Sequence, residues 1–356
     1  MLFHAASFLA LATRFCAAAQ PFPCPYNPLL KLNGAKSDHP KWLPNEIVNC
    51  SCPPGMSVTA VLPTGGPGGG PERVDVPAKV CRIPLDALGL EPMIIYGGDL
   101  QAIGPTGSGI AYGNYQISSE RSERALAKRA VMVDVGANMG MTSIAFALAY
   151  PEITVHSYEL NPGTFAFLQR NIAANNLVGR VIPHNVGLGA GTVRLSRCAI
   201  TTRFGNQMLG SKRFQQGMHD GCKGRCSAGF RQIADHLRNC TRQDSREYDL
   251  PTTSLGSALA AAGGSTGVLK VDCEGCEWDI LNEIVSAKRK KRAFRAVGDC
   301  HAVSGVTGKR MDLCKGTLER SHAGGGKLAL ARQKLVMQSR LLYASNNEPS
   351  LGMNRS

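Results

Sequence analysis

Two short segments of the sequence combine the residue types that ligand binding and acid–base chemistry need. The first, VDVGANMG (133–140), places Asp134 before a turn that contains Gly136, Asn138 and Gly140. Glycines let the backbone turn sharply and approach a ligand closely, and a helix that begins there offers unpaired N–H groups to an anionic group. We expect this segment to bind a cofactor, with Asp134 accepting a hydrogen bond from an ammonium group.

Glu159 lies roughly 20 residues after this turn, at the end of the next expected strand. Nucleotide-binding α/β proteins place at this point the acid that accepts hydrogen bonds from ribose hydroxyls. Asn185, near the end of a third expected strand, is a candidate contact to adenine, and a loop-forming asparagine is an equal alternative. The turn reads G-x-N-x-G and departs from the G-x-G-x-x-G of dinucleotide sites. The pattern therefore favours a ribose-bearing ligand that is not a dinucleotide.

The second segment, VDCEGCE (271–277), carries the carboxylates of Asp272, Glu274 and Glu277. It follows an apolar strand pattern whose carboxyl end should face the ligand crevice. Transfer of a group to a hydroxyl needs an acceptor that is held close and stripped of its proton. Asp272 and Glu274 are predicted to orient or deprotonate the acceptor, or to hold a divalent metal that does so. Glu277 is interpreted as a first-turn helix acid, which the helix dipole favours.

Three further residues near these segments have chemistry of their own. His301 ends the segment GDCH (298–301), after a fifth expected strand. It is predicted either to face the acceptor as a base or donor or to be a polar residue at a strand end. Cys273 and Cys276 have the spacing of redox motifs, but they lack the thioredoxin context. We interpret them as buried small thiols.

Strand and helix patterns alternate from residue 131 onward, as is needed to bring these segments together. Apolar strand patterns occupy 131–136, 153–159, 181–187, 267–272 and 294–299, and helical patterns follow several of them. This alternation predicts a doubly wound, mostly parallel α/β sheet with flanking helices.

Composition divides the rest of the chain. Residues 20–125 are rich in Pro and Gly with little periodicity, and 53–73 is interpreted as a linker or long surface loop. Residues 126–345 are assigned to the catalytic domain, with a Cys-rich insertion at 197–249. We interpret this insertion as a disulfide-stapled lid, with an unstructured insertion as the alternative. Residues 346–356 are assigned to a tail.

The first 19 residues resemble a signal peptide, with a short apolar stretch and the small-residue run Ala17-Ala18-Ala19 before Gln20. The absence of acids before Asp38 also suits an organelle transit peptide. The chain has 13 cysteines, and loss of Cys16 on cleavage leaves an even number, which fits disulfides in an oxidising compartment. We therefore expect the secretory pathway or an extracellular location, with an organelle or the cytoplasm as alternatives.

The net charge of +14 is concentrated in residues 284–356. A basic tail attracts phosphates or anionic membranes, but a solvated helix end and a loose terminus is the preferred interpretation. No apolar run reaches the roughly 18 residues that span a bilayer.

At the motifs described above, the sequence resembles the FkbM family of methyltransferases. The matching segments are VDVGANMGMTS (133–143), the strand ending Tyr158-Glu159, NVGLGAGTVRLS (185–196), LPTTSL (250–255) and LKVDCEGCEWDIL (269–281). The resemblance covers roughly residues 130–300. It implies a class I Rossmann-like methyltransferase fold, S-adenosylmethionine as methyl donor, and O-methylation of a hydroxyl on a carbohydrate or small metabolite.

The same resemblance implies roles for individual residues. Asp134, Gly136, Asn138, Gly140 and Glu159 correspond to the cofactor residues of the family. Asp272 and Glu274 match its acidic motif after the fourth strand. Family members often carry a Glu-x-His-like element after the fifth strand, where this chain has Asp299-Cys300-His301.

Two other functions compete with O-methylation of a small-molecule or glycan acceptor. The basic C-terminal segment suggests a nucleic-acid methyltransferase. However, the chain lacks the Asn/Asp-Pro-Pro-aromatic motif of enzymes that methylate exocyclic base amines, and its excess charge is not interleaved with aromatic residues. We therefore do not expect a nucleic-acid partner. A secreted binding protein that keeps the fold without catalysis is the other alternative, because residues 298–301 and the C-terminal part depart from the family.

Overall fold

The computed structural model describes residues 49–51, 55–63, 70–85, 88–98, 103, 110, 114–201, 246–263, 266–273, 275–289, 294–301 and 308–320. Several expectations fall outside these residues. They are the signal peptide (1–19), the tail (346–356), most of the Cys-rich insertion (197–249) and Glu274. Within the described residues, no helix is long and apolar enough to cross a membrane.

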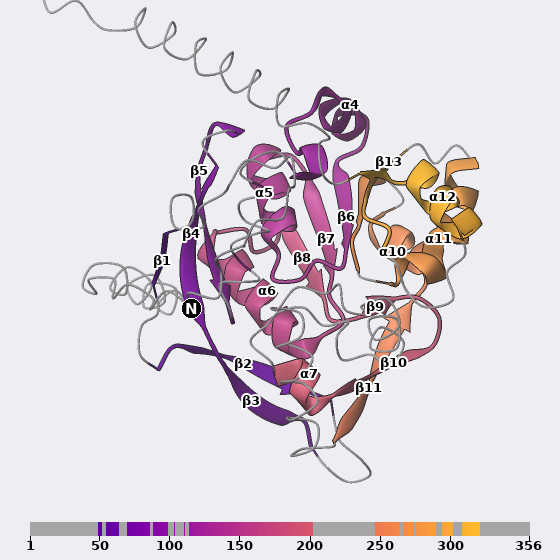
Figure 1. Ribbon diagram of the computed structural model, residues 1–356. Coiled ribbons are helices and arrows are strands. Elements are labelled where there is room, and N and C mark those ends of the chain that lie inside the picture. Colours follow the sequence, from indigo (N-terminus) through magenta and orange to yellow (C-terminus); the bar gives the residue numbers. More distant parts are fainter. Residues whose placement is uncertain are drawn as a thin grey trace, which may run out of the picture.

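A six-stranded sheet, parallel throughout, forms the centre of the molecule (Figure 1). Its order is β14-β13-β12-β6-β7-β8, with bounds β6 (Val131–Val135), β7 (Thr154–Tyr158), β8 (Val181–His184), β12 (Thr266–Val271), β13 (Arg295–Gly298) and β14 (Glu319–Arg320). Successive strands run outward in opposite directions from the β6–β12 pair, so this pair is the switch point where such sheets bind ligands. The predicted doubly wound α/β fold is confirmed.

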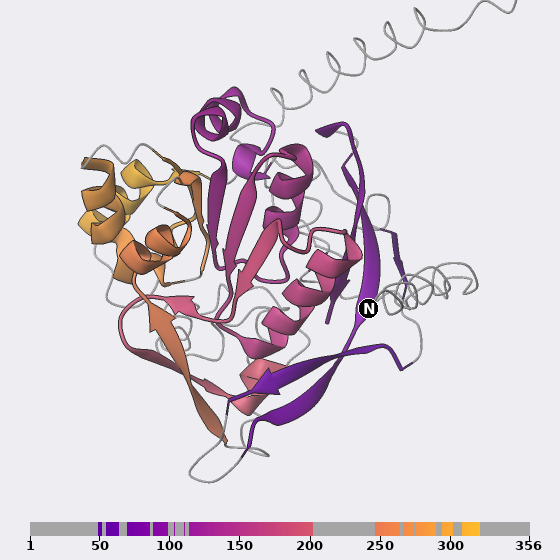
Figure 2. The same cartoon turned by 180° about the vertical axis from the view of Figure 1, so that it is seen from behind.

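Helices cover both faces of this sheet, as the two opposite views show (Figures 1 and 2). One hydrophobic core contains residues of α4 (Glu120–Lys128), α5 (Met141–Ala149) and α6 (Pro162–Ala174). The other contains residues of α10 (Leu255–Ala261), α11 (Glu277–Arg289) and α12 (Gly308–Thr317). Burial from both sides explains why all six residues of β12 are buried and why the strand patterns were continuously apolar.

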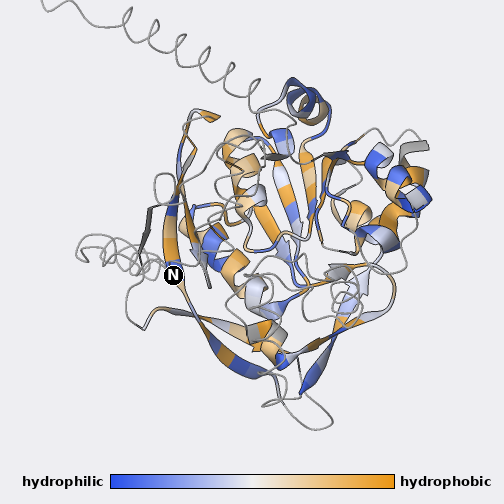
Figure 3. Ribbon diagram, in the orientation of Figure 1, coloured by the Kyte–Doolittle hydropathy of each residue, from blue (hydrophilic) through white to orange (hydrophobic). Residues whose placement is uncertain are grey.

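Local sequence explains where these helices begin. The Asn161 side chain accepts hydrogen bonds from the N–H groups of Gly163 and Thr164, and Pro162 occupies the first helical position of α6. Ser119 caps α4 in the same way. Figure 3 shows that α4 is largely hydrophilic, whereas α5 is largely hydrophobic. Accordingly, α4 lies at the surface while α5 is buried almost all round.

The N-terminal region contains strands that the sequence interpretation missed. A hairpin forms from β2 (Ser57–Leu62) and β3 (Glu72–Pro77), so the linker predicted at 53–73 is wrong where these strands lie. A second, antiparallel sheet has the order β1-β4-β5, with β1 (Asn49–Ser51), β4 (Lys79–Leu85) and β5 (Leu90–Gly97). Alternate residues of β2 are buried, as expected for a strand with one face in the core. This alternation lasts for only six residues and lies next to segments rich in Pro and Gly, so it predicts a strand only weakly.

Two asparagines of α6 attach the N-terminal sheet to the rest of the protein. The Asn171 side chain accepts from the Tyr96 N–H at 2.6 Å and donates to the Tyr96 carbonyl at 2.9 Å. One helical turn later, Asn175 pairs with the N–H and C=O of Ile94 at 2.9 and 2.7 Å. These side chains therefore satisfy backbone groups of β5, which is an edge strand among the described residues. One hydrophobic core contains residues of both the N-terminal sheet and the central sheet with its helices.

A smaller sheet lies beside the central one. Its order is β10-β11-β9, with β9 (Gly187–Leu188), β10 (Thr192–Ser196) and β11 (Glu247–Thr253), and α7 (Arg197–Thr201) follows β10. Glu72 of β3 joins the hairpin to this sheet, because its carboxylate accepts from Arg197 at 2.8 Å and from the Tyr248 hydroxyl at 2.8 Å. The two ends of the Cys-rich insertion are thus held on the body of the protein.

Candidate active site at the switch point

The loop between β6 and α5 has the sharply turned backbone that its glycines predicted. Gly136, Asn138 and Gly140 have φ angles of 73°, 53° and 89°, in the left-handed region. A Cβ atom at Gly136 would lie 2.2 Å from the backbone oxygen of Asp272. Glycine at 136 therefore allows the cofactor loop to lie directly against the end of β12, which brings the two predicted segments together.

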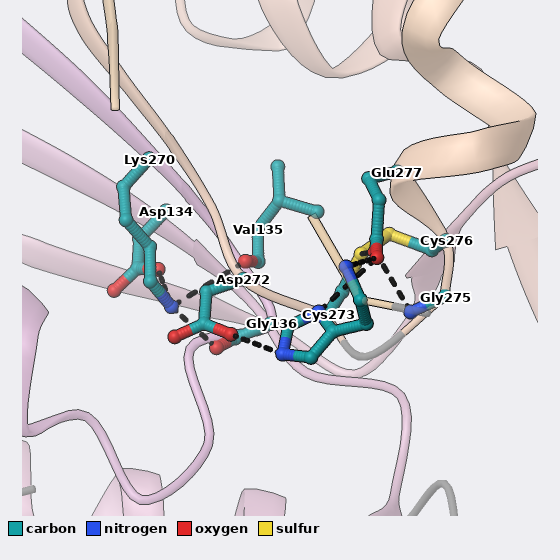
Figure 4. Close-up of a disulfide and its surroundings, with 10 residues drawn as sticks. Asp134, Val135, Gly136, Lys270, Asp272, Cys273, Gly275, Cys276 and Glu277 are labelled. Atoms are coloured by element: carbon teal, nitrogen blue, oxygen red, sulfur yellow. Dashed lines mark hydrogen bonds and ion pairs between the residues drawn. A yellow bond between two sulfur atoms is a disulfide. The ribbon is translucent and has the colours of Figure 1, made fainter. Parts of the chain in front are cut away.

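Asp134 occupies a fully buried position beneath this loop. Its carboxylate forms an ion pair with the Lys270 ammonium at 2.9 Å, and the Ser143 hydroxyl donates to it at 2.6 Å. Lys270 also donates to the Gly136 carbonyl at 2.7 Å, one of the dashed contacts in Figure 4. The structure thus shows Asp134 positioning the loop through Lys270. Its predicted contact with a ligand ammonium group stays a prediction.

Sequence reasoning missed Lys270. The signal was a lysine in the otherwise apolar strand VLKV, but its partner could not be named from the sequence. Burial would lower the pKa of Lys270, yet the carboxylates of Asp134 and Asp272 outweigh burial and raise that pKa above its ordinary value. The ammonium group is therefore charged, and it carries positive charge to the centre of the switch point.

Glu159 connects the ends of β6 and β7. Its side chain is buried, and its two oxygens accept from the N–H groups of Asn138 and Asn161, both at 2.8 Å. Burial raises the pKa of Glu159 to about 7, against the opposing effect of these hydrogen bonds. A carboxylate has about four lone-pair sites, so two backbone contacts leave it able to accept from hydroxyl groups. The ribose contact stays a prediction.

The start of α5 has the chemistry of an anion site. Its N-cap residue is Gly140, which has no side chain that could accept hydrogen bonds from the first N–H groups of the helix. Such N–H groups can bind an anionic group of a ligand. Together with Glu159 at the neighbouring strand end, this arrangement fits a ligand that has both a carboxylate and a ribose. The described residues therefore fit S-adenosylmethionine.

Asn185 lies at the surface, just after β8. Its side-chain amide donates to the carbonyl oxygens of Glu159 at 2.9 Å and Leu160 at 3.1 Å. These contacts hold the loop after β7 and agree with the loop-forming interpretation of Asn185. The alternative, a contact to adenine, stays a prediction.

Asp272, Glu277 and His301 form a cluster at the ends of β12 and β13. The His301 ring lies between the two carboxylates, with Nδ1 3.1 Å from Glu277 Oε1 and Nε2 3.5 Å from Asp272 Oδ1. Glu277 is fully buried, whereas Asp272 and His301 have side-chain exposures of 23% and 27%. The interpretation of Glu277 as a simple helix-dipole residue is therefore incomplete, because its carboxylate contacts a histidine from another strand end.

Tyr115 brings the N-terminal region to the same cluster. Its hydroxyl donates to Asp272 Oδ2, and its ring lies under the Lys270 ammonium, 5.5 Å from the ring centre. Burial, together with the Asp272 carboxylate, raises the pKa of Tyr115 well above its usual value. Its φ of 59° is rare for a bulky residue. No local sequence signal marked Tyr115, whose partner is far away in the chain.

Two disulfides flank the cluster. Cys273 is bonded to Cys276, and Cys300 to Cys314. The prediction that Cys273 and Cys276 are buried thiols is wrong, because the turn before α11 brings their sulfur atoms together (Figure 4). Asp272, Glu277 and His301 each have a disulfide-bonded cysteine as an immediate neighbour in the chain. The cross-links therefore restrain the backbone on which the cluster is built.

A metal at this site stays a prediction. Within the described ranges, no group of three or more His, Cys, Asp or Glu side chains is arranged to hold a metal ion. Glu274, one of the predicted ligands, lies outside those ranges.

No family model matches the chain. It is 27% identical over 190 residues to "31-O-demethyl-FK506 methyltransferase FkbM" of Streptomyces tacrolimicus, covering 52% of this chain and 71% of that protein. It is 28% identical over 152 residues to "Methyltransferase 1" of Beauveria bassiana (strain ARSEF 2860), covering 42% of this chain and only 56% of that protein. The chain is an FkbM-like methyltransferase.

Solved structures share weaker likeness with this FkbM-like methyltransferase. "StiE O-MT residues 961-1257" has a TM-score of 0.19 at 7% identity, covering 45% of this chain and 83% of that chain. An O-methyltransferase family protein from Burkholderia thailandensis has 0.20 at 15% identity, covering 45% and 64%. A complex of aTrm5 with tRNALeu has 0.20 at 18% identity, covering 34% and 32%. These scores are too low to support an argument, so the sheet order and the cofactor loop carry the fold assignment.

Proposed function

We propose that this FkbM-like methyltransferase transfers the methyl group of S-adenosylmethionine to a hydroxyl of a carbohydrate or small metabolite. The observation that supports the proposal is the position of the Asp272–His301–Glu277 cluster. It lies at the carboxyl end of β12, where the backbone of Asp272 contacts the cofactor loop at Gly136. Acid–base groups therefore lie next to the expected methyl donor.

The cofactor side of the site is assigned to residues at the ends of β6 and β7. The N–H groups at the start of α5 would bind the carboxylate of S-adenosylmethionine, and Glu159 would accept from its ribose hydroxyls. Asp134 and Lys270 hold the loop in place from below. When bound, S-adenosylmethionine supplies a methyl group on a sulfonium sulfur, which keeps the electron pair of the broken C–S bond.

The acceptor side needs a base, because an aliphatic hydroxyl holds its proton at neutral pH. His301 accepts that proton at Nε2, and the Asp272 carboxylate, 3.5 Å from Nε2, stabilises the resulting imidazolium. Tyr115 fixes the other Asp272 oxygen by donating its hydroxyl hydrogen. The deprotonated acceptor oxygen then forms its bond to the methyl carbon.

Binding and transfer can be measured separately. Calorimetry should show that the folded chain binds S-adenosylmethionine and not NAD, and binding of NAD alone would refute the cofactor assignment. A screen with S-adenosylmethionine labelled in its methyl group would then compare glycans, small phenols, 31-O-demethyl-FK506 and RNA as acceptors. Label on RNA alone would favour a nucleic-acid methyltransferase, and binding without any transfer would favour the non-catalytic alternative.

Asp272→Asn tests the acceptor-side assignment. We expect turnover to fall by about 10²–10⁴-fold, the usual contribution of general acid–base groups, while the affinity for S-adenosylmethionine stays within about twofold. Asp312→Asn is the matched control, because Asp312 is an exposed carboxylate on α12. Unchanged turnover in Asp272→Asn would exclude its role.

We also propose that the protein works in an oxidising compartment, in the secretory pathway or outside the cell. The Cys273–Cys276 and Cys300–Cys314 disulfides support this location, and Cys81 and Cys198 are also disulfide-bonded. Sequencing the N-terminus of the protein recovered from culture medium would test both secretion and cleavage after Ala19. Recovery only from the cytosol with free thiols would refute this location.

A further inference from the structure

We infer that Glu277 is a positioning residue that selects the tautomer of His301 and holds its ring toward Asp272. The inference rests on the proposed function, because it specifies how the base at that site is prepared. It concerns a residue that the sequence alone assigned to helix formation.

The contacts of Glu277 differ from those of an ordinary first-turn acid. Oε2 accepts from the Gly275 N–H at 2.7 Å. Oε1 accepts from the backbone N–H of His301 at 2.8 Å and lies 3.1 Å from Nδ1 of the same residue. A helix-capping role would account for a contact within the turn, but not for two contacts to a residue at the end of β13.

The backbone of His301 is fixed on its other side by the next residue of α11. The Trp278 indole Nε1–H donates to the His301 carbonyl at 2.9 Å. Two consecutive helix residues therefore hold the N–H, the C=O and the ring of His301. With these three points fixed, the ring has little freedom to turn away from Asp272.

The chemistry of these partners decides where the proton of a neutral imidazole lies. Both ring nitrogens of His301 face a carboxylate, and an ionised carboxylate only accepts hydrogen bonds. Nδ1 lies at hydrogen-bond distance from Glu277 Oε1, 3.1 Å, whereas Nε2 lies 3.5 Å from Asp272 Oδ1, so the shorter contact to Glu277 selects Nδ1 as the donor. The proton is therefore on Nδ1, and the lone pair of Nε2 points toward the side of Asp272 and the acceptor. Full burial of Glu277 strengthens the interaction, because water does not screen it.

Glu277→Gln disturbs this arrangement while keeping the shape of the side chain. The carboxylate satisfies N–H donors with both oxygens, whereas an amide has a single acceptor oxygen and a donor NH₂ group. If the NH₂ group faces His301, it donates to Nδ1 and moves the ring proton to Nε2. The base would then be in the wrong protonation state for accepting a proton.

Glu283→Gln is the matched control on the same helix. Glu283 also accepts from a backbone N–H, that of Gly256 at 3.1 Å, and this contact does not involve His301. A general effect of replacing a glutamate of α11 would appear in both variants. An effect through His301 would appear only in Glu277→Gln.

The test reads the tautomer by ¹⁵N–¹H NMR on histidine-labelled full-length protein, with His301→Gln used to assign the His301 signals. We expect the Nδ1–H form in the unaltered protein and in Glu283→Gln, and loss of that form in Glu277→Gln. An Nε2–H form in the unaltered protein overturns the inference, whether or not the variants fold. The same form in all three proteins also overturns it.

This measurement needs neither cofactor nor acceptor, so it is separate from the proposed function. If S-adenosylmethionine does not bind but the tautomer behaves as expected, the function fails and the positioning role stands. With an acceptor from the screen, Glu277→Gln should lower turnover by about 10²–10⁴-fold and leave the affinity for S-adenosylmethionine unchanged. Equal turnover in Glu277→Gln and Glu283→Gln would refute the catalytic consequence.

Discussion

Lys270→Met is predicted to lower the free energy of unfolding by about 4 kcal/mol. Lys270 and Asp134 have side-chain exposures of 3% and 0%, and their charged atoms lie 2.9 Å apart. Removing one partner of a buried ion pair costs about 3–5 kcal/mol, because the other charge is left without compensation. Met keeps most of the side-chain volume, so the loss measures charge and hydrogen bonding more than packing.

The same substitution should weaken cofactor binding. Lys270 donates to the carbonyl of Gly136 at 2.7 Å, at the turn that begins the loop between β6 and α5. Without this bond, the loop loses its link to β12. We therefore expect lower affinity for S-adenosylmethionine even at temperatures where the variant is fully folded.

Urea denaturation followed by circular dichroism would measure the stability, and calorimetry the affinity. Lys128→Met is the control, because Lys128 is exposed in the last turn of α4 and should change stability by less than about 0.5 kcal/mol. In the double variant with Asp134→Asn, the added cost of Lys270→Met should largely disappear, because no buried charge is stranded. A loss below about 1 kcal/mol, or equal losses with Asp and Asn at 134, would refute the reasoning.

Two further predictions follow from the same site. Burial raises the pKa of Glu159 from 4.5 to about 7, so the folded protein binds a proton that the unfolded chain has already lost, and the free energy of unfolding should fall by up to about 3 kcal/mol between these pH values. Affinity for S-adenosylmethionine should rise through pH 7, because the ionised Glu159 carboxylate accepts hydrogen bonds from the ribose. Glu159→Gln should abolish the pH dependence of both the stability and the affinity. If calorimetry of the unaltered protein gave the same stability and affinity across this pH range, both predictions would be contradicted. Replacing Cys300 and Cys314 with Ser opens a bridge across a sequence separation of 14 and should lower the free energy of unfolding by about 3 kcal/mol. The same change at Cys273 and Cys276, with a separation of 3, should lower it by about 2 kcal/mol, and a denaturation series that shows no loss in either variant would contradict both values.

Much of the central fold could be predicted because its signals are local. The strands of a parallel sheet are buried on both faces, so segments such as 131–136 and 267–272 appear as apolar runs. Asn161-Pro162 marks the start of α6 by cap chemistry alone. The N-terminal strands lacked such signals, since β2 alternates for only six residues beside segments rich in Pro and Gly.

The site was predictable only in part. The cofactor loop was recognisable because each of its special backbone angles calls for a Gly or Asn at that position. Tyr115 was not recognisable, because its role depends on a contact with Asp272, 157 positions away. Glu277 was assigned to the helix dipole because a local explanation sufficed for an acid in a first turn.

By itself, the sequence determined the parallel sheet, the left-handed turn after β6 and the two acidic strand ends, since each depends on residues that are neighbours in the chain. Only the tertiary structure decided the role of each charged group. Asp134 is paired with Lys270, and His301 lies between Asp272 and Glu277. Ion pairs and hydrogen bonds depend on distances of a few ångströms between side chains, and folding alone sets those distances between residues far apart in the sequence.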